Sequence, residues 1–180
     1  MEDEYLDLVD KDDQVIKKDL RSRIYAGQMP KNATIRVVNL LIFNSKGELL
    51  VPKRSMNRHI FPGCYDFSCG EHVMVGEDYD TAAIRGLEEE LGIQGVKVEF
   101  LTKLVPEEFG TRFPKKGASA FMKIYKVTHN GPFPKYDQDG IESLNWFTLE
   151  QVKQMLEKDR SHFKYDFAVV LNEMFAHNAL

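Results

Sequence analysis

The sequence contains very few cysteines, only Cys64 and Cys69 among 180 residues. They lie five positions apart without the paired spacing of a zinc site, and two thiols cannot build a disulfide framework. This composition argues against a secreted scaffold that depends on disulfides. It predicts a protein of a reducing, cytoplasmic compartment.

An excess of positive charge is also absent. Lysine and arginine total 24 against 28 aspartates and glutamates, which gives a formal net charge of −4. This balance argues against a protein whose main task is to bind a nucleic-acid backbone. An anionic small-molecule ligand would have to be bound locally, by a metal ion or by a few basic side chains.

Long hydrophobic runs, repeats and linkers are missing as well. No apolar stretch approaches the roughly 18 residues of a membrane span, and the acidic start of the chain does not resemble a secretory signal. No internal repeat or Pro/Gly/Ser-rich tract marks a domain boundary. We expect one domain over residues 1–180, with an N-terminal arm at 1–33 and a core at 34–180, and no membrane association.

The pattern of β-branched, aliphatic and turn-forming residues predicts an α/β fold with a mixed sheet and helices packed on it. In the arm, two short strands form a hairpin and a helix follows at residues 18–25. In the core, the predicted strands are residues 34–43, 48–53, 65–68, 96–105, 118–127 and 141–146. The predicted helices are residues 78–91, 149–157 and 167–177, the first ending at Gly92, and residues 70–76 are expected to form a loop.

The helix at 78–91 is the most informative segment for chemistry. Arg85 and Glu89 lie four apart and share one face, whereas Glu90 lies nearer the apolar stripe and should point toward the sheet. A carboxylate there is costly to remove from water unless it has a partner. A cation shared by Glu77, Glu89 and Glu90 would provide one, and oxygen ligands suit Mg²⁺ or Mn²⁺. The alternative is an ordinary solvated helix face, because charge runs at this spacing are common.

The same segment resembles the Nudix box. In the numbering of this chain, the box has Gly at position 71, Glu at 77, Arg-Glu at 85 and 86, an aliphatic residue at 87, Glu-Glu at 89 and 90, Gly at 92 and an aliphatic residue at 93. Seven of these nine positions match, namely Glu77, Arg85, Leu87, Glu89, Glu90, Gly92 and Ile93. Flanking segments also resemble the family, so the likeness covers most of the chain from about residue 34.

The resemblance implies a Nudix fold, in which a mixed sheet is sandwiched between helices, and a metal-dependent hydrolase of a diphosphate linkage in a nucleoside diphosphate or its derivative. The implied metal ligands are Glu77, Glu89 and Glu90, with Mg²⁺ or Mn²⁺ as the cofactor. Arg85 would orient these carboxylates and completes the expected catalytic set. The resemblance is also compatible with a homodimer.

Two positions depart from the box, because Glu71 stands in place of its first glycine and Gly86 in place of the glutamate after Arg85. In the family that glutamate commonly serves as metal ligand or general base. The change leaves open an alternative, a Nudix-fold module that binds or regulates without catalysis. A base could instead come from another loop, and the candidates are Glu107, Glu108, Asp137, Asp139 and Glu142.

The arm and the box variant also resemble the branch that includes isopentenyl-diphosphate isomerase and its hydrolase relatives. Residues 68–72, Ser-Cys-Gly-Glu-His, are similar to the isomerase Cys-Gly-His segment but have one extra residue. The family's isomerases also need two histidines near the first core strand and a pair of glutamates on a later strand. Residues 1–58 contain no histidine and residues 117–121 no carboxylate. Isomerisation is therefore the least favoured interpretation.

Four further residues are candidates for binding the substrate's phosphates: Lys53, Arg54, Arg58 and His72. The basic residues could equally be strand-edge charges, and a single loop histidine is more often solvated. Cys69 could be a reactive thiol or, more commonly, a buried apolar filler. Aromatic and basic residues at 109–116 could bind a nucleobase and its phosphate, or form a charged loop.

Overall fold

The computed structural model describes residues 3–105, 120–177 and 180. Its centre is a mixed sheet with the strand order β6-β7-β3-β4-β8, in which β5 pairs with β3 outside this path. The strands are β3 (Ile35–Phe43), β4 (Leu49–Arg54), β5 (Cys69–His72), β6 (Glu99–Leu104), β7 (Ala120–Thr128) and β8 (Ile141–Phe147). Strands β3 and β7 run parallel, and the other strand pairs run antiparallel.

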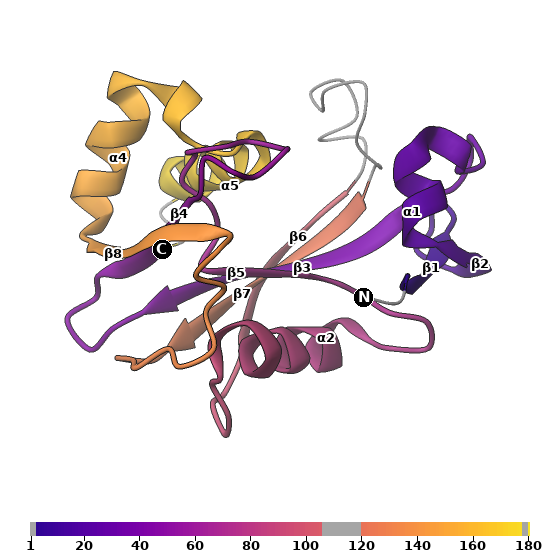
Figure 1. Ribbon diagram of the computed structural model, residues 1–180, viewed down its shortest axis with the longest axis horizontal. Coiled ribbons are helices and arrows are strands. Elements are labelled where there is room, and N and C mark those ends of the chain that lie inside the picture. The colour runs from indigo at the N-terminus through magenta and orange to yellow at the C-terminus, as the bar shows by residue number, and fades with distance from the viewer. Residues whose placement is uncertain (1–2, 106–119, 178–179) are drawn as a thin grey trace.

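Helices cover both faces of this sheet (Figure 1). One face is covered by α2 (Tyr79–Gly86) and the π-helical turn η2 (Leu87–Leu91), which together form the helix predicted at 78–91. The opposite face is covered by α4 (Leu149–Lys158), the short 3₁₀ turn η3 (Arg160–His162) and α5 (Tyr165–Ala176). Each face buries its own hydrophobic cluster, so the predicted α/β sandwich is confirmed.

The strand predicted at residues 65–68 is wrong. Tyr65 makes only isolated bridges, and the regular strand is β5, in the segment that we expected to be a loop. Strand β4 meets β3 only at the pair Phe43 and Leu49 and then turns toward β8. The vacated edge of β3 is taken by β5, and the Ser68 hydroxyl bridges the gap, donating to the Leu50 carbonyl at 2.6 Å. Long-range pairing therefore decides where this strand lies.

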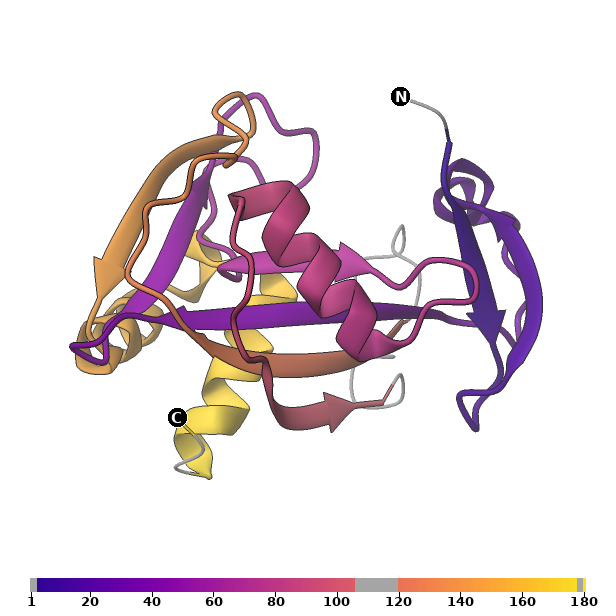
Figure 2. The same cartoon turned by 90° about the horizontal axis from the view of Figure 1, so that it is seen from below.

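The arm lies at one end of the sheet (Figure 2). It consists of the hairpin β1 (Tyr5–Val9) and β2 (Val15–Leu20), followed by α1 (Arg21–Arg23) and the π-helical turn η1 (Ile24–Gln28). The predicted helix at 18–25 begins too early, because β2 continues to Leu20, where it pairs with Tyr5.

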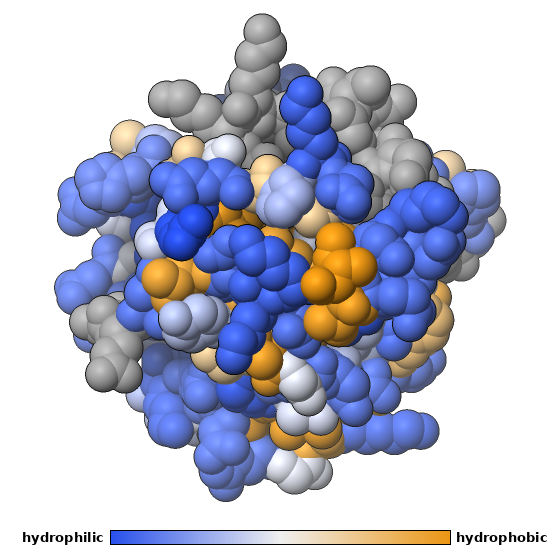
Figure 3. Space-filling model, turned by 90° about the vertical axis from the view of Figure 1, so that its right-hand side faces the viewer, coloured by the Kyte–Doolittle hydropathy of each residue, from blue (hydrophilic) through white to orange (hydrophobic). Residues whose placement is uncertain are grey.

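The arm is attached to the core by backbone pairing and by burial. Val9 and Thr34 exchange two backbone hydrogen bonds of 2.9 Å. Leu6, Leu8 and Ile24 are buried in a cluster that includes core residues. Seen from the arm side, the surface is mainly hydrophilic with a small hydrophobic group (Figure 3). In the described part of the chain, no helix is both long and apolar enough to cross a membrane.

Candidate functional site

The helix that carries the acidic segment has well-defined ends. Asp78 caps its N-terminus, its carboxylate accepting from the Thr81 backbone N–H at 2.8 Å. Gly92 ends the helix with φ of 72°, a left-handed conformation that glycine adopts without steric cost. The last turn is π-helical, a feature often found at functional sites. These ends fix the positions of Arg85, Glu89 and Glu90.

Arg85 is the centre of a network of carboxylates. Its guanidinium donates to both oxygens of Glu77, at 3.0 and 3.1 Å. It also donates to Glu89 at 3.0 Å, to Glu71 at 3.2 Å and to the His72 carbonyl at 2.7 Å. Desolvation opposes the charged form of Arg85, but the glutamates outweigh it and raise the pKa of the guanidinium above its ordinary value. The guanidinium of Arg85 thus links the loop, strand β5 and the helix.

The loop before the helix is held from the arm as well as from Arg85. The Glu77 carboxylate accepts from the Met74 backbone N–H at 3.0 Å, so both ends of this tight loop are tied together. Asp7, a buried arm residue, accepts from the Gly76 N–H at 2.9 Å. Glu77 is therefore fixed before any ligand binds.

Glu90 faces a different partner. Its carboxyl group interacts with the Cys69 thiol, the Gly70 backbone N–H and the carboxyl group of Glu71. Removal from water and then the nearby Glu71 charge raise the pKa of Glu90 to about 7. The residue as a whole still has a large exposed area. The Cys69 thiol and the Gly70 N–H act in the opposite direction and lower this pKa, but they do not outweigh burial and the Glu71 charge.

The predicted metal ligands are divided between these two environments. Glu77 and Glu89 bind Arg85, whereas Glu90 lies against Glu71. Among residues 3–105, 120–177 and 180, no three His, Cys, Asp or Glu side chains form a metal-ligand group. A pair of carboxylates is nevertheless a suitable donor set, because Mg²⁺ keeps several waters and binds through one or two carboxylates plus substrate phosphates.

His72 lies between the arm and the core. Its Nε2 is 2.7 Å from the Tyr25 hydroxyl, and the two rings meet edge to face. Burial, and then the charges of Arg21, Lys164 and Arg85, lower the pKa of His72 to about 4. At neutral pH the ring is uncharged, so any contact with a phosphate would be a neutral hydrogen bond.

The three predicted basic residues are all engaged in ion pairs. Lys53 binds Glu142 at 2.8 Å, Arg54 binds Asp66 at 2.8 Å and Arg58 binds Asp137 at 2.6 Å. None of these pairs includes Arg85 or its carboxylate partners in the described structure. The structure therefore does not gather them with the acidic helix.

The candidate bases are placed only in part. Glu107 and Glu108, like the aromatic and basic residues at 109–116, lie outside the described residues. Asp137 and Glu142 are partners of Arg58 and Lys53. Asp139 donates its backbone N–H to Asp137 in the same turn. None of these three has a hydrogen bond or ion pair to the acidic helix among the contacts described.

Three neighbours of the predicted site residues were not predicted: Glu71, which contacts Arg85, and Tyr25 and Lys164, which lie near His72. Glu71 had been noted only as a departure from the box. Lys164 has ion pairs with Asp66 at 3.4 Å and Asp166 at 3.2 Å, and its charge acts on His72 and Tyr25. No local pattern could have found Tyr25 or Lys164, because they come from the arm and from the start of α5.

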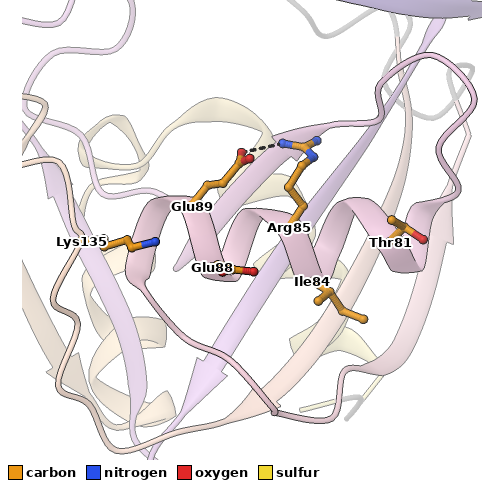
Figure 4. A pocket seen from close by; sticks show the side chains of 6 residues that line it. All are labelled: Thr81, Ile84, Arg85, Glu88, Glu89 and Lys135. Carbon is orange, nitrogen blue, oxygen red and sulfur yellow. Dashed lines mark hydrogen bonds and ion pairs between the residues drawn. The ribbon is translucent and has the colours of Figure 1, made fainter.

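An open hollow lies along the outer side of the acidic helix (Figure 4). It is lined by Thr81, Ile84, Arg85, Glu88, Glu89 and Lys135. Arg85 and Glu89 point toward each other on one side of the helix, and Lys135 approaches from a neighbouring segment (Figure 4). Glu90 and Glu71 do not line it, so we regard the hollow as the border of the site rather than its centre.

Comparison with known proteins gives consistent matches. The family model described as NUDIX domain matches residues 33–167. An uncharacterized Nudix hydrolase of Nostoc sp. is 40% identical over 158 residues, which is 86% of each chain. A Nudix hydrolase of Deinococcus radiodurans is 31% identical over 150 residues, or 83% of this chain and 82% of the relative.

Solved structures agree with these matches. The crystal structure of DR0079 from Deinococcus radiodurans superposes with a TM-score of 0.74 at 28% identity, covering 94% of this chain and 98% of that one. The NUDIX domain of Shewanella oneidensis NrtR, crystallised with ADP ribose, gives a TM-score of 0.58 at 16% identity, over 87% and 97% of the chains. The second likeness concerns the fold alone.

Proposed function

The chain belongs to the Nudix family and has its fold, and from this premise we propose that it is a metal-dependent hydrolase of a diphosphate linkage. The proposed substrate is a nucleoside diphosphate or a nucleoside diphosphate derivative. Family membership supports hydrolase activity in general. The finer assignment is supported by the carboxylates gathered by Arg85 and by Glu90 next to them.

The observation that carries this proposal is the position of Glu90. Its carboxyl group lies against the carboxyl group of Glu71, and burial and this neighbour both raise its pKa. Arg85 pairs with Glu71, Glu77 and Glu89 but not with Glu90 in the described structure. Two adjacent carboxyl groups repel each other when both are ionised, and a bound cation would relieve this repulsion.

In the proposed reaction the protein positions the groups around the phosphates. Mg²⁺ or Mn²⁺, when bound, neutralises charge on the phosphoryl oxygens and lowers the pKa of the attacking water. Glu90, which lies against strand β5, is a proposed metal ligand, and Glu77 and Glu89 form ion pairs with Arg85 beside it. Arg85 is a positioning residue, since its donors are already used by the protein. The His72 ring, which is uncharged at neutral pH, lies against Tyr25 and has no described contact with these carboxylates.

The second candidate function is a Nudix-fold module that binds a diphosphate metabolite without cleaving it. Gly86 favours this alternative, because it removes a carboxylate from the helix. Isomerisation of isopentenyl diphosphate remains the third candidate. The likeness to that branch remains a prediction, as do a homodimer, the absence of nucleic-acid binding and a cytoplasmic location.

The test is product release from a panel of nucleoside diphosphates, dinucleotides, nucleotide sugars, ADP ribose and prenyl diphosphates, with Mg²⁺ or Mn²⁺ and with EDTA. We expect turnover of at least one nucleotide substrate that EDTA abolishes. Glu90→Gln should lower kcat/KM by about 100-fold or more, the order of effect reported for lost electrostatic stabilisation of a transition state. The matched control, Glu157→Gln, changes an exposed glutamate of α4, on the opposite face of the sheet, and should stay within about threefold of the wild type.

If a folded protein that binds Mg²⁺ or a nucleotide releases no product from any substrate of the panel, the hydrolase is rejected in favour of the binding module. Conversion of isopentenyl diphosphate to its isomer without phosphate release would instead support the third candidate.

A further inference from the structure

The two departures from the Nudix box are in contact with each other. A Cβ atom built on Gly86 would lie 2.5 Å from Cγ and 3.3 Å from Cβ of Glu71. It would also lie 3.4 Å from the Cys69 sulfur. Distances below 3.0 Å are not tolerated between carbon atoms, so a side chain at 86 requires Glu71 to move. The glutamate at 71 and the glycine at 86 are therefore one coupled feature.

The side chain of Glu71 is directed by its strand. Strand β5 pairs with β3, with Glu71 opposite Val38, and this register places the side chain across the helix at Gly86. The carboxylate accepts from Arg85 at 3.2 Å and is only 18% exposed. It also meets the carboxyl group of Glu90. The Glu71 carboxylate thus extends from strand β5 to the side of the helix where Arg85 and Glu90 lie.

Filling space does not explain this choice of residue. An apolar side chain would pack over Gly86 without placing a charge beside Glu90, where like charges are unfavourable. The ion pair with Arg85 stabilises the Glu71 carboxylate, and a cation bound between the two acids would also offset its repulsion with Glu90.

We infer that Glu71 supplies, from strand β5, the carboxylate that the box has at position 86, and that Glu71 and Glu90 form the cation-binding pair of this protein. This inference rests on the proposed metal-dependent function. It makes Glu71 and Glu90 the cation ligands, in place of the three ligands Glu77, Glu89 and Glu90. Gly86 then marks a relocated carboxylate rather than a lost one. Glu77 and Glu89 border the pair through Arg85.

The experiment measures Mn²⁺ binding to the full chain in the absence of substrate, by electron paramagnetic resonance of free Mn²⁺. Glu71→Gln keeps the shape of the side chain and should weaken Mn²⁺ binding by about tenfold or more, the size of effect expected at a metal site. Glu71→Gly should do the same. The double variant Glu71→Gly with Gly86→Glu restores the order of the box and should regain affinity to within about threefold of the wild type. Glu157→Gln, on α4, is the control and should bind Mn²⁺ as the wild type does.

Circular dichroism and thermal midpoints establish that each variant is folded. Wild-type affinity in folded Glu71→Gln would overturn the inference, and so would an exchange variant that binds no better than Glu71→Gly. Hydrolysis of the nucleotide panel is measured on the same proteins. EDTA-sensitive turnover with Mn²⁺ affinity independent of Glu71 would reject this inference and keep the hydrolase. Mn²⁺ binding that depends on Glu71, with no turnover of any substrate, would support the pair and reject the hydrolase.

Discussion

His72 connects the chemistry of a single side chain to the stability of the fold. Its pKa falls from an ordinary value of 6.5 to about 4 in the folded protein, chiefly because the ring is buried. The unfolded chain therefore binds a proton at higher pH than the folded chain. The stability that the neutral ring contributes to the folded state is fully present above pH 6.5. It is lost as the pH falls from 6.5 toward 4.

We predict that His72→Gln flattens the pH dependence of the free energy of unfolding between pH 6.5 and 4. The decrease in slope cannot exceed about 1.4 kcal/mol per pH unit, which is the limit for one proton. It should be smaller than this limit, because the ring is partly exposed. Urea titrations at several pH values measure it. His177→Gln is the control, because that side chain is 76% exposed. An unchanged slope in His72→Gln would contradict the shift.

Single residues also show how far a sequence can predict a site. The contact between Arg85 and Glu89 follows from helical spacing, and the structure has it at 3.0 Å. Glu71 reaches the site through the register of β5 against β3, and Tyr25 through the docking of the arm. No helical or strand periodicity contains such information, because it describes only neighbours along one element.

At the scale of elements, α4 shows a strong local signal. Thr148 Oγ1 accepts from the Gln151 N–H at 3.2 Å, and the Thr148 N–H donates to Gln151 Oε1 at 2.8 Å. This reciprocal capping satisfies two backbone donors that the helix leaves free. The start of the helix was accordingly predicted correctly at residue 149.

We predict that Thr148→Ala lowers the free energy of unfolding by about 1 kcal/mol, as loss of a helix cap usually does. Thr148→Ser keeps the hydroxyl and should remain within about 0.5 kcal/mol of the wild type. Both values come from urea denaturation followed by circular dichroism. Equal stability of the alanine and serine variants would show that the cap contributes nothing.

Elements without such local signals were predicted poorly. Strand β5 contains Gly70, and its pairing with β3 depends on the departure of β4 from that edge. A glycine in this strand is required by crowding, since a Cβ there would lie 2.6 Å from the Asn39 side-chain oxygen. The π-helical turn at 87–91 is likewise invisible in a pattern of period 3.6.

At the scale of the whole molecule, Asp13 connects the arm to the core. Its carboxylate accepts from Arg36 at 2.6 Å, Lys103 at 2.5 Å and the Tyr79 hydroxyl at 2.9 Å. Its backbone has φ of 61°, which aspartate and asparagine tolerate better than most residues. These groups lower the pKa of Asp13 even though burial opposes the shift.

We predict that Asp13→Asn destabilises the protein by about 2 kcal/mol, because two basic residues lose their anionic partner in a partly buried place. Hydrogen exchange of β1 and β2 should accelerate more than that of β7, since the arm loses a connection that the core sheet does not need. Asp12→Asn is the matched control, because Asp12 pairs with exposed Lys11 in the same turn. Equal protection of the arm in both variants would contradict this role.

The parallel pairing of β3 with β7 also determines when the molecule can fold during its synthesis. Ile35 to Phe43 lie near the start of the core and pair with Ala120 to Thr128, in its second half. Such distant pairing requires most of the chain to be present before the central sheet closes. A ribosome-bound chain that stops before β7 would expose the edge of β3, and its apolar residues would be open to aggregation or to chaperones. The protein should therefore acquire its cooperative fold only after β7 has left the ribosome.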